Sequence, residues 1–275
     1  MYSLNLKGRL WKVNRPLVMG IINITPDSFY SHSRFDNPDL VLKKAEQMLA
    51  EGADILDIGA QSTRPASDLI SAKEELRRLI PSIELISEKI PRVVISVDSF
   101  YAEVASRSIE AGALIVNDVS GGTIDRDMLE TVSGLHVPYI CMHMPGTPQT
   151  MNTLNFYGDV TNDVTGFLAQ RISACRKAGI VDVIADPGFG FGKNPDQNFE
   201  LLSKLDRLQV LRVPVLVGLS RKSTIYKTLG ITAEESLNGT TVLNTIALLK
   251  KAAILRVHDV KEAVEAVKLV SHLIN

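Results

Sequence analysis

The chain has little of several features that would assign it to a specialised class. Its 275 residues include only two cysteines, Cys141 and Cys175, and one tryptophan. No apolar run approaches the ~20 residues that a membrane span requires, so a helical membrane protein is excluded and no membrane partner is expected. Two cysteines are too few for a disulfide framework, and we expect buried, reduced thiols.

The chain also lacks an excess of positive or negative charge. The chain has 30 Lys and Arg against 31 Asp and Glu, which gives a formal charge of -1 at pH 7. Proteins that bind nucleic acid typically carry a basic stripe, so no nucleic-acid partner is expected. The first dozen residues alternate apolar and polar side chains and lack the apolar core of a signal peptide. A cytoplasmic protein is therefore expected.

What the chain does contain is one repeated unit, in which a helical segment leads to a short apolar strand. Residues 2–12 are interpreted as a β-hairpin with Lys7 and Gly8 at the turn, and residues 16–22 as a strand buried on both faces. Helices are expected at 38–52, 72–89, 101–111, 124–134, 158–179, 196–208, 233–251 and 260–273. The strands between them are expected at 55–58, 93–98, 114–117, 138–143, 183–186, 214–217 and 253–256.

Strict alternation of strand and helix predicts parallel strands with right-handed crossovers. Glycines at positions 52, 112 and 179 fit the left-handed position that ends a helix before the next strand. Eight units at this length indicate an α/β fold, a single (β/α)8 TIM-barrel domain over residues 1–275, with the short N-terminal hairpin covering its bottom. A doubly wound open sheet is the alternative. It is disfavoured because no glycine-rich dinucleotide motif follows the first strand.

Polar residues follow nearly every predicted strand. In a (β/α)8 barrel the C-terminal ends of the strands and the loops after them build the active site. A single aspartate at such a position is often only a helix cap, and Asp57, inside its strand, is expected only to tie loops together. The whole collection favours a ligand site: Asn23, 61–65, Asp98, Asn117, Asp118, 142–144, Asp186, 220–223, Arg256 and His258.

Three of these residues suit a planar heterocycle. Asp98, Asn117 and Asp186 offer two carboxylates and an amide, the mixed pattern that N–H and carbonyl groups on one edge require. Arg256 and His258 lie two positions apart, so they share a face in extended backbone and can hold a phosphate or pyrophosphate.

Other positions suit anions and metal ions. Arg64 would extend the anion site, and Lys222 and Ser223 begin a helix after a glycine, which is a favourable place for an anion. Asn23 offers an oxygen ligand for Mg²⁺.

A glycine-rich segment, residues 186–193, follows the sixth strand with the sequence Asp-Pro-Gly-Phe-Gly-Phe-Gly-Lys. Glycine loses much backbone entropy on folding, so three glycines here favour a loop that approaches a ligand, with Asp186 pointing at it. Its two phenylalanines are expected to be exposed. His143, between Met142 and Met144, fits a satisfied core histidine as well as a ligand.

Taken together, these motifs resemble the dihydropteroate synthase family over nearly the whole chain. The resemblance implies a transferase of folate biosynthesis that joins p-aminobenzoate to 6-hydroxymethyl-7,8-dihydropterin pyrophosphate, with Mg²⁺ as cofactor. It also implies a homodimer and sulfonamide inhibitors in the p-aminobenzoate site. The matching segments are 19–29, 57–59, 62–65, 96–99, 117–118, 142–144, 146–148, 186–193, 220–223 and 256–259.

The resemblance further implies a role for individual residues. The expected pterin-binding residues are Asp98, Asn117, Asp186 and Lys222, with Met142 also among the substrate-binding residues. Pyrophosphate and its Mg²⁺ are assigned to Asn23, Arg256 and His258. The p-aminobenzoate site is assigned to Thr63, Arg64, Pro65, Phe191, Lys222 and Ser223. The catalytic residues are expected to be Asp98, Asp186, Lys222 and Arg256.

The sequence departs from the commonest family pattern at residues 30–34 and at Ala60 and Gln61. Both departures lie in loops 24–36 and 60–71, which are expected to move and to order over bound pyrophosphate, so they bear on loop closure and drug affinity. Two alternatives share the fold. A methyltransferase-type pterin barrel is disfavoured by the pyrophosphate residues, and a non-catalytic pterin-binding relative by the intact set of site residues.

Overall fold

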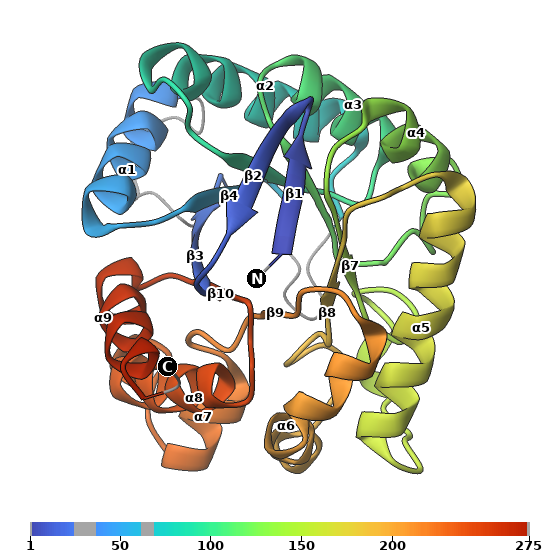
Figure 1. Ribbon diagram of the computed structural model, residues 1–275, viewed down its shortest axis with the longest axis vertical. Coiled ribbons are helices and arrows are strands. Elements are labelled where there is room, and N and C mark those ends of the chain that lie inside the picture. Colours follow the sequence, from blue (N-terminus) through green and yellow to red (C-terminus); the bar gives the residue numbers. More distant parts are fainter. Residues whose placement is uncertain (1, 25–36, 62–68, 274–275) are drawn as a thin grey trace.

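The computed structural model describes residues 2–24, 37–61 and 69–273, and these form the expected barrel. Eight parallel strands run in the order β8-β7-β6-β5-β4-β3-β10-β9. A parallel bridge between Ala185 and Val215, with the Ala185 N–H donating to the Pro214 carbonyl at 2.9 Å, joins the two edges. The sheet is therefore nearly closed, and the helices surround it (Figure 1).

The observed elements follow the predicted order. The barrel strands are β3 (Leu17–Asn23), β4 (Ile55–Gly59), β5 (Ile95–Asp98), β6 (Ile115–Asp118), β7 (Tyr139–Met142), β8 (Val183–Asp186), β9 (Leu216–Val217) and β10 (Ile254–Val257). The α-helices are α1 (Pro38–Glu51), α2 (Ala72–Lys89), α3 (Ala102–Glu110), α4 (Met128–Leu135), α5 (Val160–Ala178), α6 (Pro195–Ser203), α7 (Ser223–Leu229), α8 (Leu237–Leu249) and α9 (Val260–Ser271).

Two predicted helices differ from the observed ones. The helix expected at 196–208 ends at Ser203, and a 3₁₀ helix, Leu205–Leu211, follows it. Between β9 and β10 the chain forms α7 before α8, because Gly230 takes a left-handed conformation with φ of 67° and ends α7. The helix α7 begins at Ser223, which agrees with the helix start indicated by the sequence at Lys222 and Ser223.

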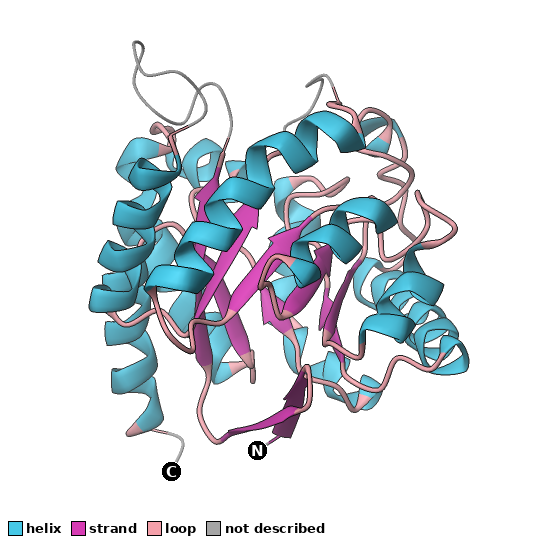
Figure 2. Cartoon of the chain, turned by 90° about the horizontal axis from the view of Figure 1, so that it is seen from above, coloured by secondary structure: helices cyan, strands magenta, loops and turns pink. Residues whose placement is uncertain are grey.

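The N-terminal hairpin consists of β1 (Tyr2–Leu6) and β2 (Arg9–Val13). Lys7 and Gly8 both have positive φ, 52° and 91°, which is the two-residue turn whose twist matches the flanking strands. The hairpin lies across one end of the barrel (Figures 1 and 2). Its buried side chains form one cluster with the lower barrel interior: Leu4, Leu6, Val13, Leu17, Met19, Ile55, Val94, Ile115, Ile140, Ile184, Leu216 and Ile254.

The barrel interior changes character along its axis. Because side chains two positions apart in a strand share a face, each apolar residue of the lower interior is followed by a second inward residue nearer the C-terminal end. In five of these segments that second residue is polar: Ile55 precedes Asp57, Val94 precedes Ser96, Ile115 precedes Asn117, Ile184 precedes Asp186 and Ile254 precedes Arg256. An apolar floor thus carries a polar upper layer.

The outward faces of the strands pack against the helices in a second, larger core. Cys141 of β7 and Cys175 of α5 are free and buried in this layer, as the sequence predicted. In the part of the chain that the structure describes, every helix is too short or too polar to cross a membrane.

Removal of a side chain from the barrel floor is expected to be costly. Leu4 is 2% exposed, so Leu4→Ala leaves a cavity and lowers the free energy of unfolding by about 2–5 kcal/mol. Leu10, in the same hairpin, is 63% exposed, and Leu10→Ala is expected to change it by less than about 0.5 kcal/mol. Urea denaturation of both variants measures the difference. Equal effects would contradict the role given to the hairpin.

Candidate active site

A buried ion cluster lies at the centre of the polar upper layer. Arg256 of β10 donates from Nε to Asp57 of β4 at 2.6 Å and from Nη2 to Asp98 of β5 at 2.7 Å. Asn117 of β6 donates from Nδ2 to the same Asp57 oxygen at 3.0 Å. One guanidinium therefore joins three strands that are distant in the sequence. Its Nη1 has no hydrogen-bond partner among the described residues and remains available to an anion.

Asp57 is the residue that sequence reasoning undervalued. It was expected only to tie loops together, yet it is fully buried inside the barrel and accepts hydrogen bonds from Asn117 and Arg256. The signal was available in the alternation of β4, where Asp57 follows the inward Ile55 by two residues. Its partner on β10 follows it by 199 positions, so only the closed barrel brings them together.

The cluster shifts the titration of its members. Burial raises the pKa of Asp98 to about 7; Arg256 opposes this rise, and the carboxylates of Asp57, Asp118 and Asp186 add to it. Burial also raises the pKa of Asp186, against the attraction of Lys222. A polar layer with these shifts is typical of a functional site.

Lys222 enters this layer from the start of α7. Burial lowers its pKa to about 8, while Asp186 favours the charged form. The Lys222 ammonium donates to the Phe189 carbonyl and lies 4.6 Å from the centroid of the Phe191 ring, a cation–π contact. A Cβ at Gly190, where φ is 79°, would lie 2.9 Å from Lys222 Cδ. The absence of a side chain at Gly190 therefore leaves room for the Lys222 side chain beside the loop.

The glycine-rich loop after β8 differs from its prediction in one respect. Phe189 is fully buried in the outer core, and Phe191 is half-buried, so neither is an exposed aromatic. Asp186 accepts the Gly188 N–H at 2.7 Å. A Cβ at Gly188 would lie 2.0 Å from the His143 carbonyl oxygen, so glycine here permits close packing against the chain after β7, in addition to any approach to a ligand.

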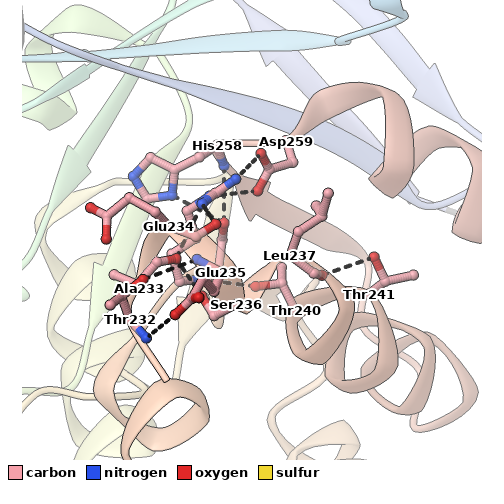
Figure 3. A network of polar contacts seen from close by, with 12 residues as sticks. Thr232, Ala233, Glu234, Glu235, Ser236, Leu237, Thr240, Thr241, His258 and Asp259 are labelled. Carbon is pink, nitrogen blue, oxygen red and sulfur yellow. Dashed lines mark hydrogen bonds and ion pairs between the residues drawn. The ribbon is translucent and has the colours of Figure 1, made fainter. Parts of the chain in front are cut away.

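A second polar network lies where β9 and β10 end. Ser220 Oγ accepts the His258 N–H at 3.2 Å and lies 3.0 Å from His258 Nδ1. A serine hydroxyl has one donor and two acceptor sites, so Ser220 forms both contacts with His258 at once. Arg221 donates to both Asp259 oxygens at 2.9 and 2.7 Å and to the Ala233 and Glu234 carbonyls at 3.1 and 2.7 Å. Figure 3 labels these three partner residues and His258. This network fixes the ends of two neighbouring strands.

The remaining predicted residues lie around this centre or outside the described chain. Asn23, at the end of β3, is exposed. Met142 is buried in a small cluster with Phe100, Val119, Met144 and Met151, and Phe191 packs against it. Ser223 is the first residue of α7. Thr63, Arg64 and Pro65, and most of loops 24–36 and 60–71, lie outside the described residues.

Two described residues fix the segment that leads into α2. Gln61 accepts the Ile70 N–H at 2.9 Å and donates to the Ile70 carbonyl at 3.2 Å. Tyr101, which follows β5, donates to the same carbonyl at 3.1 Å. The departure at Gln61 thus forms a paired amide contact that a carboxylate, which cannot donate when ionised, would not make.

Fold and site together define a (β/α)8 barrel with a buried charged ligand site at the carboxyl ends of its strands. Residues 19–258 match the family model described as "Pterin binding enzyme". Because this match covers most of the chain, the chain belongs to the pterin-binding enzyme family.

Individual relatives agree with this assignment. The chain is 40% identical over 266 residues to dihydropteroate synthase of Escherichia coli, covering 96% of this chain and 94% of that protein. It is 43% identical over 258 residues to the folic acid synthesis protein fol1 of Schizosaccharomyces pombe; this covers 91% of the chain but only 35% of that longer protein. The solved Yersinia pestis dihydropteroate synthase with a sulfonamide drug complex has a TM-score of 0.92 at 38% identity, covering 99% and 98% of the two chains.

Asp57→Asn tests whether the ion cluster organises the site. Asparagine can place its one acceptor oxygen where Asn117 and Arg256 both donate, but it carries no charge, so the charge-assisted hydrogen bond with Arg256, worth about 1.5–3 kcal/mol, is weakened. Pterin affinity, measured by calorimetry, is expected to fall at least about 10-fold. Asp127→Asn, at an exposed position before α4, is the matched control and should leave affinity unchanged. Unchanged affinity in Asp57→Asn would contradict this role.

Proposed function

We propose that this chain joins p-aminobenzoate to 6-hydroxymethyl-7,8-dihydropterin pyrophosphate, forming 7,8-dihydropteroate and pyrophosphate. The single observation that carries the proposal is the Arg256 guanidinium, which is held by Asp57 and Asp98 and still offers Nη1 to an anion. One residue thus connects a carboxylate-lined heterocycle pocket with a pyrophosphate site. The E. coli relative, which is named for this reaction, supports the assignment.

The reaction exchanges one bond at the pterin methylene carbon. The carbon–oxygen bond to pyrophosphate breaks, and its electron pair leaves with the pyrophosphate. The resulting cation is delocalised into the pterin ring. The lone pair of the aromatic amine forms the new carbon–nitrogen bond, and the nitrogen then releases one proton. An aromatic amine is a nucleophile at neutral pH, so the site has to stabilise charge more than it has to supply a base.

The upper barrel layer suits that task. The carboxylates of Asp98 and Asp186 lie on the pterin side, where negative charge stabilises the developing cation. Asn117, held by Asp57, presents its amide oxygen to the same pocket. Arg256 Nη1 and the imidazole of His258 are proposed to receive the negative charge of the leaving group. Asp57 and Asp98 hold Arg256, and Ser220 holds His258, before the substrate arrives.

Mg²⁺ fits this site through Asn23. The Asn23 side chain is exposed at the end of β3 and has no hydrogen bond to any described residue, so its amide oxygen is available. Mg²⁺ usually takes one or two protein ligands and completes its shell with water and substrate phosphates. Within the described chain, no group of three or more His, Cys, Asp or Glu is arranged to hold a metal ion by itself. When bound, Mg²⁺ would neutralise charge on the leaving pyrophosphate.

The p-aminobenzoate side is framed by Phe191, Lys222 and Ser223. The half-buried Phe191 ring offers an apolar face, and the Lys222 ammonium and the first turn of α7 offer positive charge to the carboxylate. Thr63, Arg64 and Pro65 complete this assignment outside the described residues. Sulfonamide drugs, present in the Y. pestis relative, are proposed to bind here in competition with p-aminobenzoate.

Assembly and location are further parts of the proposal. A homodimer is supported by exposed apolar side chains on α8 and α9, where Val242 is 49%, Leu249 48% and Leu269 70% exposed. A cytoplasmic protein is consistent with the two free cysteines.

The proposed activity is tested by pyrophosphate release from dihydropterin pyrophosphate and Mg²⁺, with and without p-aminobenzoate. Release coupled to dihydropteroate formation is expected, and Lys222→Ala and Asp98→Asn should each reduce it by 100-fold or more, on the order of the loss of one charge-stabilising group. Pterin binding without pyrophosphate release would support the non-catalytic or methyltransferase-type alternative instead.

Pterin affinity should depend on pH in both directions. Below pH about 7 the carboxyl group of Asp98 takes up a proton in the free protein, and above pH about 8 Lys222 loses one. If the pocket binds through the carboxylate and the ammonium, affinity rises with pH through the first pKa and falls through the second. Calorimetry with a pterin that lacks pyrophosphate avoids titration of the substrate phosphate. Asp98→Asn should remove the acid limb; an unchanged acid limb would contradict the assignment.

Removal of the metal ion gives an independent test. EDTA is expected to abolish turnover, and excess Mg²⁺ should restore it. Asn23→Ala should raise the Mg²⁺ concentration for half-maximal activity by roughly 10-fold, because one oxygen ligand is lost. Asn238→Ala, at an exposed position on α8, is the control and should not change it. Full activity in EDTA would exclude the proposed Mg²⁺ requirement.

A further inference from the structure

A buried lysine that the proposed mechanism does not use lies beneath the glycine-rich loop. Lys193 is only 8% exposed. Its Nζ lies 3.0 Å from His143 Nδ1, 2.9 Å from the Gly188 carbonyl oxygen and 3.0 Å from the Phe191 carbonyl oxygen. An ammonium group has three N–H donors and no acceptor, so these three contacts use all of its hydrogens.

The chemistry of this contact couples the protonation states of Lys193 and His143. Burial lowers the pKa of Lys193 to about 7. The charged lysine donates to His143 Nδ1, which places the proton of the neutral ring on Nε2, whereas a neutral lysine amine accepts from a protonated Nδ1. Burial and the neighbouring Lys193 charge lower the pKa of His143 to about 3, so the ring stays neutral. The expectation left open for His143 is thereby settled in favour of a satisfied core histidine. The contact ties the chain after β7 to the loop after β8.

The same loop provides both groups that hold Lys222. The Phe189 carbonyl accepts from the Lys222 ammonium, and the Phe191 ring lies 4.6 Å beneath it. The Gly188 carbonyl accepts from the Phe191 N–H at 3.1 Å as well as from Lys193. Lys193 therefore holds the backbone that positions Phe191, and Phe191 in turn contacts Lys222.

We propose that Lys193, together with His143, is a positioning residue for the p-aminobenzoate side of the site. It holds Phe191 and Lys222 in place by cross-linking the loop from below, and it touches neither substrate. The inference rests on the proposed function, since it assigns Phe191 and Lys222 to that side. The pterin side depends on it less, because Asp98, Asn117 and Asp186 come from the strands themselves.

Steady-state kinetics of Lys193→Met test whether Lys193 affects the p-aminobenzoate side more than the pterin side. Methionine fills a similar volume but makes none of the three hydrogen bonds. The KM for p-aminobenzoate is expected to rise about 10-fold or more, while the KM for dihydropterin pyrophosphate changes less than about 3-fold. The matched control is Tyr157→Phe, which removes only the hydrogen bond to the Gly192 carbonyl of the same loop, 2.9 Å long. It should change either KM less than about 3-fold.

Two kinetic results would overturn the proposal. One is an equal change, or no change, in both KM values for Lys193→Met. The other is a Tyr157→Phe effect as large as that of Lys193→Met, which would point to general weakening of the loop.

Nitrogen-15 NMR of histidine-labelled wild-type protein tests the cross-link even if Lys193→Met fails to fold. At a pH of about 5.5, below the Lys193 pKa of about 7 and above the His143 pKa of about 3, the His143 Nδ1 signal should be that of an unprotonated ring nitrogen, and Nε2 should carry the proton. A proton on Nδ1 at this pH would rule out donation from the Lys193 ammonium and would overturn the proposal. Wild-type protein that lacks turnover would contradict the proposed function alone, since the NMR result does not depend on catalysis.

Discussion

The buried guanidinium of Arg256 is the interaction on which the site depends. Its Nε and Nη2 are held by two carboxylates on β4 and β5, and its own strand is β10. Removal of one partner from a buried ion pair leaves an uncompensated charge, which is strongly destabilising. The three strands are thus held in a fixed relation at the level of the ligand site, while Arg256 Nη1 has no hydrogen-bond partner among the described residues.

The polar upper layer of the barrel lies directly above an apolar layer. The floor is the apolar cluster that the hairpin closes from below. On several strands, side-chain alternation changes the apolar floor into the polar layer within two residues, so the two layers are parts of one pattern. The low polarity of the floor would strengthen charge interactions in the upper layer. The raised pKa of Asp98 reflects the same burial.

Much of the architecture could be predicted from the sequence because it depends on local sequence patterns. The order of strands and helices, the hairpin turn at Lys7 and Gly8 and the helix-ending glycines all depend on neighbours in the chain. The strand-end residues Asp98, Asn117, Asp186 and Arg256 were found because parallel strands end at one face.

The missed features depend on contacts between distant segments. Asp57 finds its partner only when β4 and β10 lie on the same barrel, and Phe189 is buried only because the loop folds back over the outer core. The cross-link by Lys193 likewise joins two loops, and a lysine that ends a glycine-rich segment gives no local signal of burial. The start of α7 at Lys222 and Ser223 was indicated by the sequence, but its separation from the following helix was not predicted.

The central claim is that Asp57 and Arg256 act as one unit in shaping the ligand site. A double-mutant cycle with Asp57→Asn and Arg256→Gln, read out as pterin affinity by calorimetry at fixed salt concentration, tests this claim most directly. Residues that act as one unit should show a coupling free energy above about 1 kcal/mol, with the double variant little worse than the worse single variant. Losses that add within about 0.5 kcal/mol would show independent residues and would contradict the account.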